Sequence, residues 1–143
     1  SDAFNGIIFE NRLKNNDIGI NCSRVSFQVI AGNEIASKDI CLSLYDADSN
    51  MILYNNVTDA NYGVFIDDSK GNTIGLNNFI DTERDAAFYR CHSNAWAQNY
   101  WGQARILPKF IFGTRGNLGL IPWLNMDPLP LEEPIPIDSL FSL

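Results

Sequence analysis

The chain has few residues that could cross-link it, contact phosphate or enter a membrane. Three cysteines among 143 residues are too few for a disulfide scaffold, and their odd number leaves at least one without an intrachain partner. Ten Lys and Arg residues against 17 Asp and Glu residues give a net charge of −7, which argues against nucleic acid as a partner. No apolar run approaches the roughly 18 residues of a membrane span. The length of 143 residues fits a single domain, and these absences argue against a disulfide scaffold and a membrane span.

Asparagine, by contrast, is abundant, with 17 in the chain. Five asparagines recur at a spacing of 22 residues. The residues three positions before and two positions after each of them are all apolar, and range in size from valine to tryptophan. A fixed period of this length is the signature of a repeat architecture. The repeated asparagines are Asn11, Asn33, Asn55, Asn77 and Asn99.

Within each window the apolar residues alternate over short stretches, as Val64 and Ile66 do, which predicts brief strands rather than helices. Such windows, stacked at the strand spacing of about 4.8 Å, form a parallel β-helix. The asparagine column predicts a ladder at a sharp corner. Asparagine tolerates the left-handed backbone region, and each stacked amide can donate to the coil on one side and accept from the other.

The repeat is similar to that of a known family. The segment GVFIDDSKGNTIGLNNFI, residues 63–80, resembles the NosD-like right-handed parallel β-helix repeat, which belongs to the carbohydrate-binding and sugar-hydrolase, pectin-lyase-like β-helices. The segment NAWAQNYWG, residues 94–102, resembles the last coil of archaeal secreted or surface members. The resemblance covers about residues 6–130. It implies an all-β fold, a right-handed parallel β-helix of about five 22-residue coils with an irregular Pro-rich C-terminal cap, on a secreted or cell-surface protein.

Proline marks where the coils are expected to stop. All six prolines lie at residue 108 or later, and proline cannot donate to a β-ladder. We therefore expect residues 1–102 to form the coils and residues 103–143 to form a capping segment of the same domain. A solenoid needs such a cap to hide its last coil. The side chains expected to cover that coil are Phe110, Ile111, Phe112 and those of residues 121–123.

The start of the chain lacks an equivalent cap, because residues 1–5 are too few to cover a coil. Either the chain is the C-terminal part of a longer β-helix, or the first coil pairs with another molecule. An open coil edge is a template for association. We therefore predict a homodimer through residues 6–27, where the open end presents Ile8, Leu13, Ile20 and Cys22.

Two groups of acidic residues stand in register. In one column Asp46 and Asp68 lie on adjacent coils between Arg24 below and Arg90 above, which predicts stacked ion pairs on a solvated face. A second group forms an acidic ridge whose hard oxygen atoms suit Ca²⁺, although a merely solvated acidic face explains it as well. The residues proposed for calcium are Asp39, Asp59, Asp81, Glu83 and Asp85.

Alternation also turns a set of aromatic and acidic side chains outward on adjacent coils. Aromatic rings stack on the C–H faces of sugars, while carboxylates accept hydrogen bonds from sugar hydroxyls. The alternative is that these side chains are covered by the C-terminal tail or a neighbour. The ligand-binding candidates are Tyr45, Phe65, Asp67 and Tyr89.

Catalytic and copper-binding residues are sparse. His92 is the single histidine, and its neighbour Cys91 projects to the opposite side of an extended strand. Hydrolysis could use Asp67 with Asp46 or Asp68, but no motif fixes their separation. The NosD name implies copper, which favours clusters of His, Met and Cys. Here Met51 and Met126 are far apart, Cys22 falls in an inward column, and Cys41 and Cys91 are expected to face outward without forming a disulfide.

Taken together, these patterns predict an extracellular or cell-surface β-helix module that binds carbohydrate or a cell-surface polymer. They predict no cofactor, with calcium as the alternative. A lyase or glycoside hydrolase acting on an acidic polysaccharide is the alternative, and a structural surface or assembly protein is the third. The sequence leaves open whether the protein is an enzyme.

Overall fold

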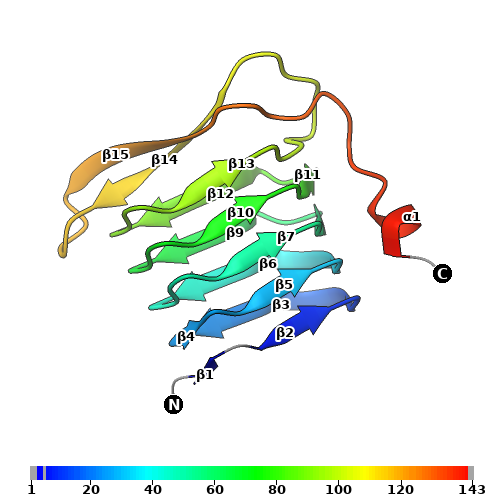
Figure 1. The fold of residues 1–143 in the computed structure, drawn as a ribbon. Coiled ribbons are helices and arrows are strands. Elements are labelled where there is room, and N and C mark those ends of the chain that lie inside the picture. The colour runs from blue at the N-terminus through cyan, green and yellow to red at the C-terminus, as the bar shows by residue number, and fades with distance from the viewer. Residues whose placement is uncertain (1–2, 5, 142–143) are drawn as a thin grey trace.

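The computed structural model describes residues 3–4 and 6–141, which form a stack of coils (Figure 1). Strands at equivalent places in successive coils pair in parallel, so the stack grows by one coil for every turn of the chain. In the described part of the chain the strands are β1 (Ala3–Phe4), β2 (Ile7–Phe9), β3 (Arg12–Ser23), β4 (Val25–Ser26), β5 (Val29–Ala31), β6 (Glu34–Tyr45), β7 (Met51–Leu53), β8 (Asn56–Thr58), β9 (Tyr62–Asp67), β10 (Thr73–Gly75), β11 (Asn78–Ile80), β12 (Arg84–Tyr89), β13 (Ala95–Ala97), β14 (Lys109–Arg115) and β15 (Ile121–Asp127), and the helix is α1 (Ile137–Phe141).

Two sheets form the principal faces of the stack. The narrow sheet has the strand order β13-β10-β7-β5-β2. The broad sheet has the order β11-β8-β6-β9-β12-β14-β15, with β3 also paired to β6. Parallel partners across the narrow sheet lie 22 residues apart, as Ile30, Ile52 and Ile74 do. The parallel β-helix with about five coils of 22 residues is therefore confirmed.

The repeated apolar columns build the core between the sheets. Ile30, Ile52 and Ile74 line up beneath the narrow sheet and are fully buried. Burying one such side chain stabilises the fold by about 1.5–3 kcal/mol. At the upper end of the core, Trp101 stacks on Phe79 with ring centroids 4.6 Å apart and planes 9° from parallel. The large aromatic ring therefore fills the top of the column where the repeat ends.

The predicted asparagine ladder runs along one corner of the coils. The Oδ1 atom of Asn77 accepts the backbone N–H of Asn55 at 2.9 Å and its side-chain amide at 3.0 Å. The Asn55 amide also donates to the carbonyl of Ile30 in the coil below, at 2.9 Å. Asn33, Asn55, Asn77 and Asn99 are fully buried. Every buried amide in this series is thus satisfied by its neighbours, as burial of a polar group requires.

The left-handed residues at this corner are not the asparagines themselves, contrary to the prediction. Positive φ angles fall on the residue immediately before each asparagine, with values from 55° to 68°. The asparagine side chain is thereby turned into the stack instead of forming the bend. The left-handed residues of this corner are Glu10, Gly32, Tyr54, Leu76 and Gln98.

A second, shorter amide ladder stands at another corner, and the sequence analysis did not identify it. Asn50 accepts the backbone N–H of Gln28 at 2.9 Å. Asn72 then accepts both amide groups of Asn50, at 2.9 and 3.0 Å, and Asn94 accepts both from Asn72, at 3.0 Å. Two corners of the stack are therefore held by the same type of hydrogen bond.

A buried carboxylate ends the first ladder at its upper end. Asp127, at the end of β15, is fully buried and receives donors on both oxygen atoms. Its Oδ2 accepts from the backbone N–H and side-chain amide of Asn99, at 2.9 and 3.2 Å, and from the indole N–H of Trp101 at 3.0 Å. Its Oδ1 accepts from the backbone N–H groups of Gln98 and Leu129, at 2.9 and 3.3 Å. Asp127 therefore supplies the acceptor that a further asparagine would have supplied.

The segment after the last coil adds a hairpin and a tail. Strand β14 pairs with β12 through Phe88 and Gly113, and β15 runs antiparallel to β14 (Figure 1). Ile111 is buried against the coils, as expected. The expectation that Phe110 and Phe112 also cover the last coil is wrong, because alternation along β14 turns them away from it and leaves them 48% and 72% exposed.

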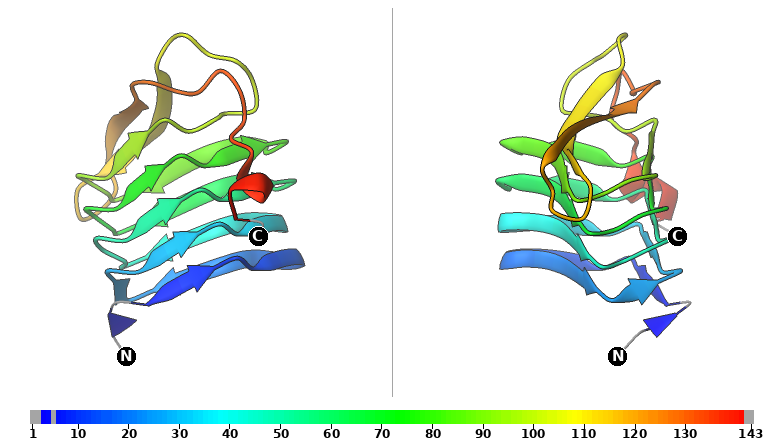
Figure 2. Two further views of the ribbon diagram at one scale, coloured as in Figure 1. Left: turned by 45° about the vertical axis from the view of Figure 1, so that its right-hand side comes forward. Right: turned by 90° about the vertical axis from the view of Figure 1, so that its left-hand side faces the viewer.

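The tail returns along the outside of the stack, and α1 lies beside the lower coils (Figure 2). The side chain of Asn78 holds it by accepting from the backbone N–H of Ile135 and donating to its carbonyl, both at 2.8 Å. No helix in the described residues is long and apolar enough to cross a membrane.

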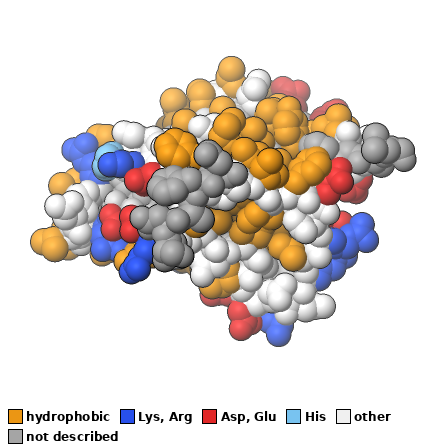
Figure 3. Space-filling model, turned by 60° about the horizontal axis from the view of Figure 1, so that its bottom comes forward, with side chains coloured by type: hydrophobic (Ala, Val, Ile, Leu, Met, Phe, Trp, Pro, Cys, Tyr) orange, Lys and Arg blue, Asp and Glu red, His pale blue; other side chains and the backbone are white. Residues whose placement is uncertain are grey.

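The first coil is less open than the sequence suggested. Strand β1 pairs with β4, so residues before the first repeat already cover part of its edge. Ile20 and Cys22 are 6% and 5% exposed, whereas Ile7 on β2 is 73% exposed. Hydrophobic side chains are visible on this end of the molecule (Figure 3). Association through residues 6–27 stays a prediction.

The ladder predicts a position-dependent loss of stability. Replacing Asn77 by Ala leaves the two amide donors of Asn55 without their acceptor and should lower the free energy of unfolding by about 1–3 kcal/mol. Urea denaturation of the purified protein measures this change. Asn11→Ala is the matched control, because Asn11 is exposed and water can replace its partners. Equal losses in the two variants would contradict this account of the ladder.

A second prediction concerns the carboxylate that ends the ladder. Asp127→Asn keeps the shape of the side chain but places an NH₂ group against backbone or indole donors. The free energy of unfolding should fall by about 1–3 kcal/mol, whereas Asp138→Asn on the exposed surface of α1 should change it by less than about 0.5 kcal/mol. Thermal and urea unfolding compare the two variants. A stable Asp127→Asn protein would show that this end of the ladder does not need two acceptor oxygen atoms.

Candidate functional site

Strands β6, β9 and β12 place the ligand-binding candidates on three successive coils. The register sets Tyr45 opposite Asp67, and Asp67 opposite Tyr89. Phe65 lies two residues before Asp67 on β9 and therefore points to the same side of the sheet. The structure thus brings together the outer-face cluster, defined as Tyr45, Phe65, Asp67 and Tyr89. Their role in binding stays a prediction.

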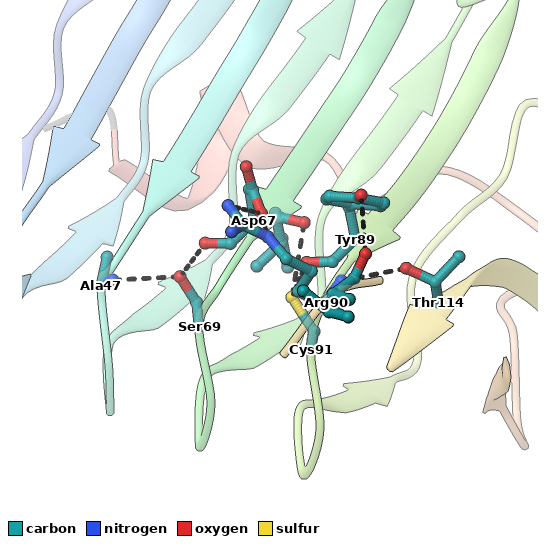
Figure 4. A network of polar contacts seen from close by, with 9 residues as sticks. Ala47, Asp67, Ser69, Tyr89, Arg90, Cys91 and Thr114 are labelled. Carbon is teal, nitrogen blue, oxygen red and sulfur yellow. Dashed lines mark hydrogen bonds and ion pairs between the residues drawn. The ribbon is translucent and has the colours of Figure 1, made fainter. Parts of the chain in front are cut away.

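An arginine from the next corner holds the carboxylate of this cluster. The Nε and Nη2 atoms of Arg90 both lie 2.9 Å from Oδ1 of Asp67 (Figure 4). This hydrogen bond, together with the negative charges of Asp67 and Asp68, raises the pKa of Arg90. The guanidinium also lies over the Tyr89 ring, 5.2 Å from its centroid. Asp67 is therefore fixed in orientation and largely neutralised, which suits hydrogen bonding more than nucleophilic attack.

The loop of the β14–β15 hairpin covers one edge of Tyr89. The hydroxyl of Tyr89 donates to the carbonyl of Leu118 at 3.2 Å. Gly119 adopts φ 65°, and a Cβ atom at this position would lie 2.3 Å from the tyrosine ring. Only glycine fits there, since any side chain would collide with the ring. The expected alternative, burial beneath the C-terminal segment, therefore applies to part of Tyr89.

All three aromatic rings of the cluster keep some surface exposed to solvent. Tyr45 is 42% exposed and Tyr89 retains 38% exposure. Phe65 is half-buried, and Tyr62 packs edge-on against it with centroids 5.6 Å apart. Tyr45 and Tyr89 are two coils apart, roughly 10 Å at the ordinary strand spacing. Two ring faces at this separation, with an oriented carboxylate between them, form a surface on which adjacent sugar units can lie.

The corner column of Arg24, Asp46, Asp68 and Arg90 has a different role from the one predicted. These residues have positive φ angles of 55°, 48°, 47° and 53°, so they form a bend of the coil. The ion pair of Arg90 is with Asp67 in the neighbouring column instead of Asp68. Because the left-handed bend redirects each side chain, the sequence column does not translate into a column of ion pairs.

The acidic ridge is partly neutralised by other side chains. Asp85 accepts from the hydroxyl of Thr82 at 2.7 Å and from Lys109 at 2.9 Å. Asp39 accepts from the amide of Asn61 at 3.2 Å. The ridge residues Asp59 and Asp81 again occupy left-handed bends. In the described residues no group of three or more His, Cys, Asp or Glu side chains could hold a metal ion, and calcium at the ridge stays a prediction.

The three cysteines are free and all are buried. The expectation that Cys41 and Cys91 face outward is wrong. The Sγ atom of Cys41 donates to the carbonyls of Ile35 and Thr58 inside the bend of β6. Cys91 follows the left-handed Arg90, which breaks the alternation and turns its thiol inward. Burial raises the pKa of Cys41 and Cys91, and raises that of Cys22 to about 11.

Comparison with known proteins gives one match. The family model described as "Periplasmic copper-binding protein (NosD)" matches residues 1–117. No curated protein and no solved structure matches the chain.

The donor atoms of the described residues do not fit the copper in that description. Copper prefers thiolates, thioethers and imidazoles gathered at one place, and a thiol must lose its proton to bind. The thiols here are protonated core groups, and His92 is exposed with Ser93 as its neighbour at 3.4 Å. Met51 and Met126 lie on β7 and β15, which belong to different sheets. These side chains do not converge on one site.

Thiol burial predicts a loss of stability at alkaline pH. Because the pKa of Cys22 is about 11 in the folded protein and near 9.0 in the unfolded chain, the unfolded thiol ionises first. The resulting stability is complete below pH 9 and is lost as the pH rises toward 11, by at most about 1.4 kcal/mol per pH unit. Urea unfolding at pH 8, 9 and 10 should give a steeper decline for the wild type than for Cys22→Ala. Parallel declines would contradict this assignment.

Proposed function

This chain belongs to the NosD family, and on that basis we propose that it is an extracellular or periplasmic β-helix module that binds carbohydrate on the outer face of β6, β9 and β12. The periplasmic description of the family is consistent with that location. The observation that carries the proposal is the outer-face cluster, in which two exposed tyrosine rings flank an oriented carboxylate on successive coils.

The chemistry of the cluster matches a sugar chain. The exposed rings offer apolar faces to sugar C–H groups, and the phenol hydroxyl of Tyr45 adds a polar end. Asp67 lies between the tyrosines and is held by Arg90, so it needs no reorganisation before it accepts a hydroxyl. Preorganisation of this kind lowers the entropic cost of binding. The rigid β-helix supports the cluster from behind, through the buried Val64 and Ile66 of the same strand.

The charge of the cluster favours a neutral ligand. Arg90 and Asp67 neutralise one another, and the protein as a whole carries a net charge of −7. A highly anionic polysaccharide would be repelled unless Ca²⁺ bridged it to the acidic ridge. Neutral glycans are therefore expected to bind without added metal, and acidic glycans only in its presence.

Substitution of single rings tests the proposal. A glycan array probed with the full chain, with Ca²⁺ or with a chelator, identifies ligands, and titration calorimetry measures their affinity. Tyr45→Ala and Phe65→Ala should each weaken binding by about 5- to 30-fold, because each removes a stacking surface worth about 1–2 kcal/mol. Met51→Ala, an equally exposed position on the narrow sheet, should leave affinity unchanged.

Two results would overturn the proposal. One is an array without any retained glycan under either condition. The other is a ligand whose affinity falls equally in Tyr45→Ala and Met51→Ala. Analysis of the recovered ligand for shortened or unsaturated products separates binding from cleavage.

A further inference from the structure

The hairpin of β14 and β15 presents an apolar face to solvent. Phe110 lies opposite Met126, and Phe112 lies opposite Leu124. These four side chains are 48%, 44%, 72% and 46% exposed, respectively. On the reverse face of the same strands, Ile111 and Asp127 are buried against the coils. We call the exposed set of Phe110, Phe112, Leu124 and Met126 the hairpin face.

The hairpin face departs from the ordinary pattern of an exposed sheet. An antiparallel pair with one face in water alternates apolar inward with polar outward. Here both positions of two successive cross-strand pairs are apolar on the outward side. Ile106, Leu107 and Leu129, at the same end of the hairpin, are a further 86%, 70% and 68% exposed. Apolar surface concentrated in this way marks an interaction site.

The size of this surface matches one side of a protein interface. Taking about 200 Å² for a fully exposed large side chain, the hairpin face exposes on the order of 450 Å². The three flanking aliphatic side chains raise the total to roughly 900 Å². A stable protein–protein interface removes about 800 Å² from each partner. The hairpin face and its flanks are therefore large enough for a dimer.

The charges favour a second copy of the chain as the occupant. Each molecule carries a net charge of −7, so repulsion between two copies is least where the contact surface itself bears no charge, and the hairpin face has no charged side chain. An anionic membrane would instead be attracted by exposed basic residues beside the apolar side chains. The basic residues of the hairpin point to its reverse face, where Lys109 is paired with Asp85 at 2.9 Å and Arg115 lies 3.5 Å from the ring centroid of Trp123.

Hydrogen bonds to the last coil already fix the position of the hairpin in the monomer. The hydroxyl of Thr114 accepts the backbone N–H of Arg90, and its carbonyl accepts that of Cys91, both at 3.1 Å. Tyr89 fixes the hairpin loop through Leu118. A preordered surface loses little entropy on association.

We propose that the chain forms a twofold homodimer in which the two hairpin faces pack against each other. In such an isologous interface, Phe112 of one protomer packs near Leu124 of its partner, and the same contact recurs across the axis. The proposal goes beyond carbohydrate binding and uses residues outside the outer-face cluster.

Sedimentation velocity across about 1–200 µM tests the proposal with the full chain. The wild type should shift from monomer to dimer as its concentration rises. Phe112→Asp should raise the dimer dissociation constant by at least about 30-fold, since it buries a charge at the centre of the interface. Ile7→Asp is the matched control, because Ile7 is 73% exposed but lies on the first coil, and it should leave dimerisation unchanged. Circular dichroism confirms that each variant is folded.

Hydrogen exchange gives a readout without any substitution. Residues 109–115 and 121–127 should become more protected at high concentration, while residues 6–27 should not. Three outcomes would overturn the proposal. The first is a monomer throughout the concentration range, and the second is a dimer that Ile7→Asp dissociates and Phe112→Asp does not. The third is a monomer that binds vesicles of phosphatidylcholine and phosphatidylglycerol in a flotation assay and loses this binding in Phe112→Asp. The second outcome would establish association through the first coil instead.

Discussion

The hydrogen bond from one asparagine to the amide oxygen of the asparagine 22 residues later is the interaction on which the structure depends. Each amide also reaches a backbone carbonyl of the coil below, so a shift of one residue would break several bonds at once. The ladder thereby fixes the register in which the apolar columns stack. That register in turn decides which side chains meet on the outer face, since Tyr45, Asp67 and Tyr89 are neighbours only at a 22-residue offset.

The ladder has a direction, and this direction requires different groups at its two ends. Each asparagine accepts from the coil before it and donates to the coil after it. The last asparagine therefore needs a partner that only accepts, which Asp127 provides with a buried carboxylate. At the opposite end Asn11 is exposed, so its side-chain oxygen can accept hydrogen bonds from water. The hairpin is attached to the stack through this same aspartate, so the cap and the ladder are stabilised together.

The sequence predicted what repeats and missed what does not. The apolar columns, the asparagine ladder and the proximity of the outer-face cluster all follow from one period. The role of Asp127 at the end of the ladder was not predicted, because Asp127 lies 28 residues after Asn99 and not 22. The ion pair between Arg90 and Asp67 was missed for the same reason, because the two residues are 23 apart, although each was named separately. The thiols of Cys41 and Cys91 were assigned outward by strict alternation, which bends and left-handed residues interrupt. The second ladder did have a visible signal, in the spacing of Asn50, Asn72 and Asn94, but Gln28 at its start obscured it.

Because the ladder has a direction, a stack of this kind can become longer or shorter only by whole coils. A coil contacts only the coils next to it, and each coil presents the same acceptor below and the same donors above. One complete 22-residue unit could therefore be gained or lost with both ends preserved, whereas a partial unit would misalign every column above it. Each added unit would lengthen the stack by about 4.8 Å and extend its outer face by one more row of side chains. Proteins built on this stack can thus differ in the length of the outer face by whole coils, while the last coil is always closed by the same kind of acceptor.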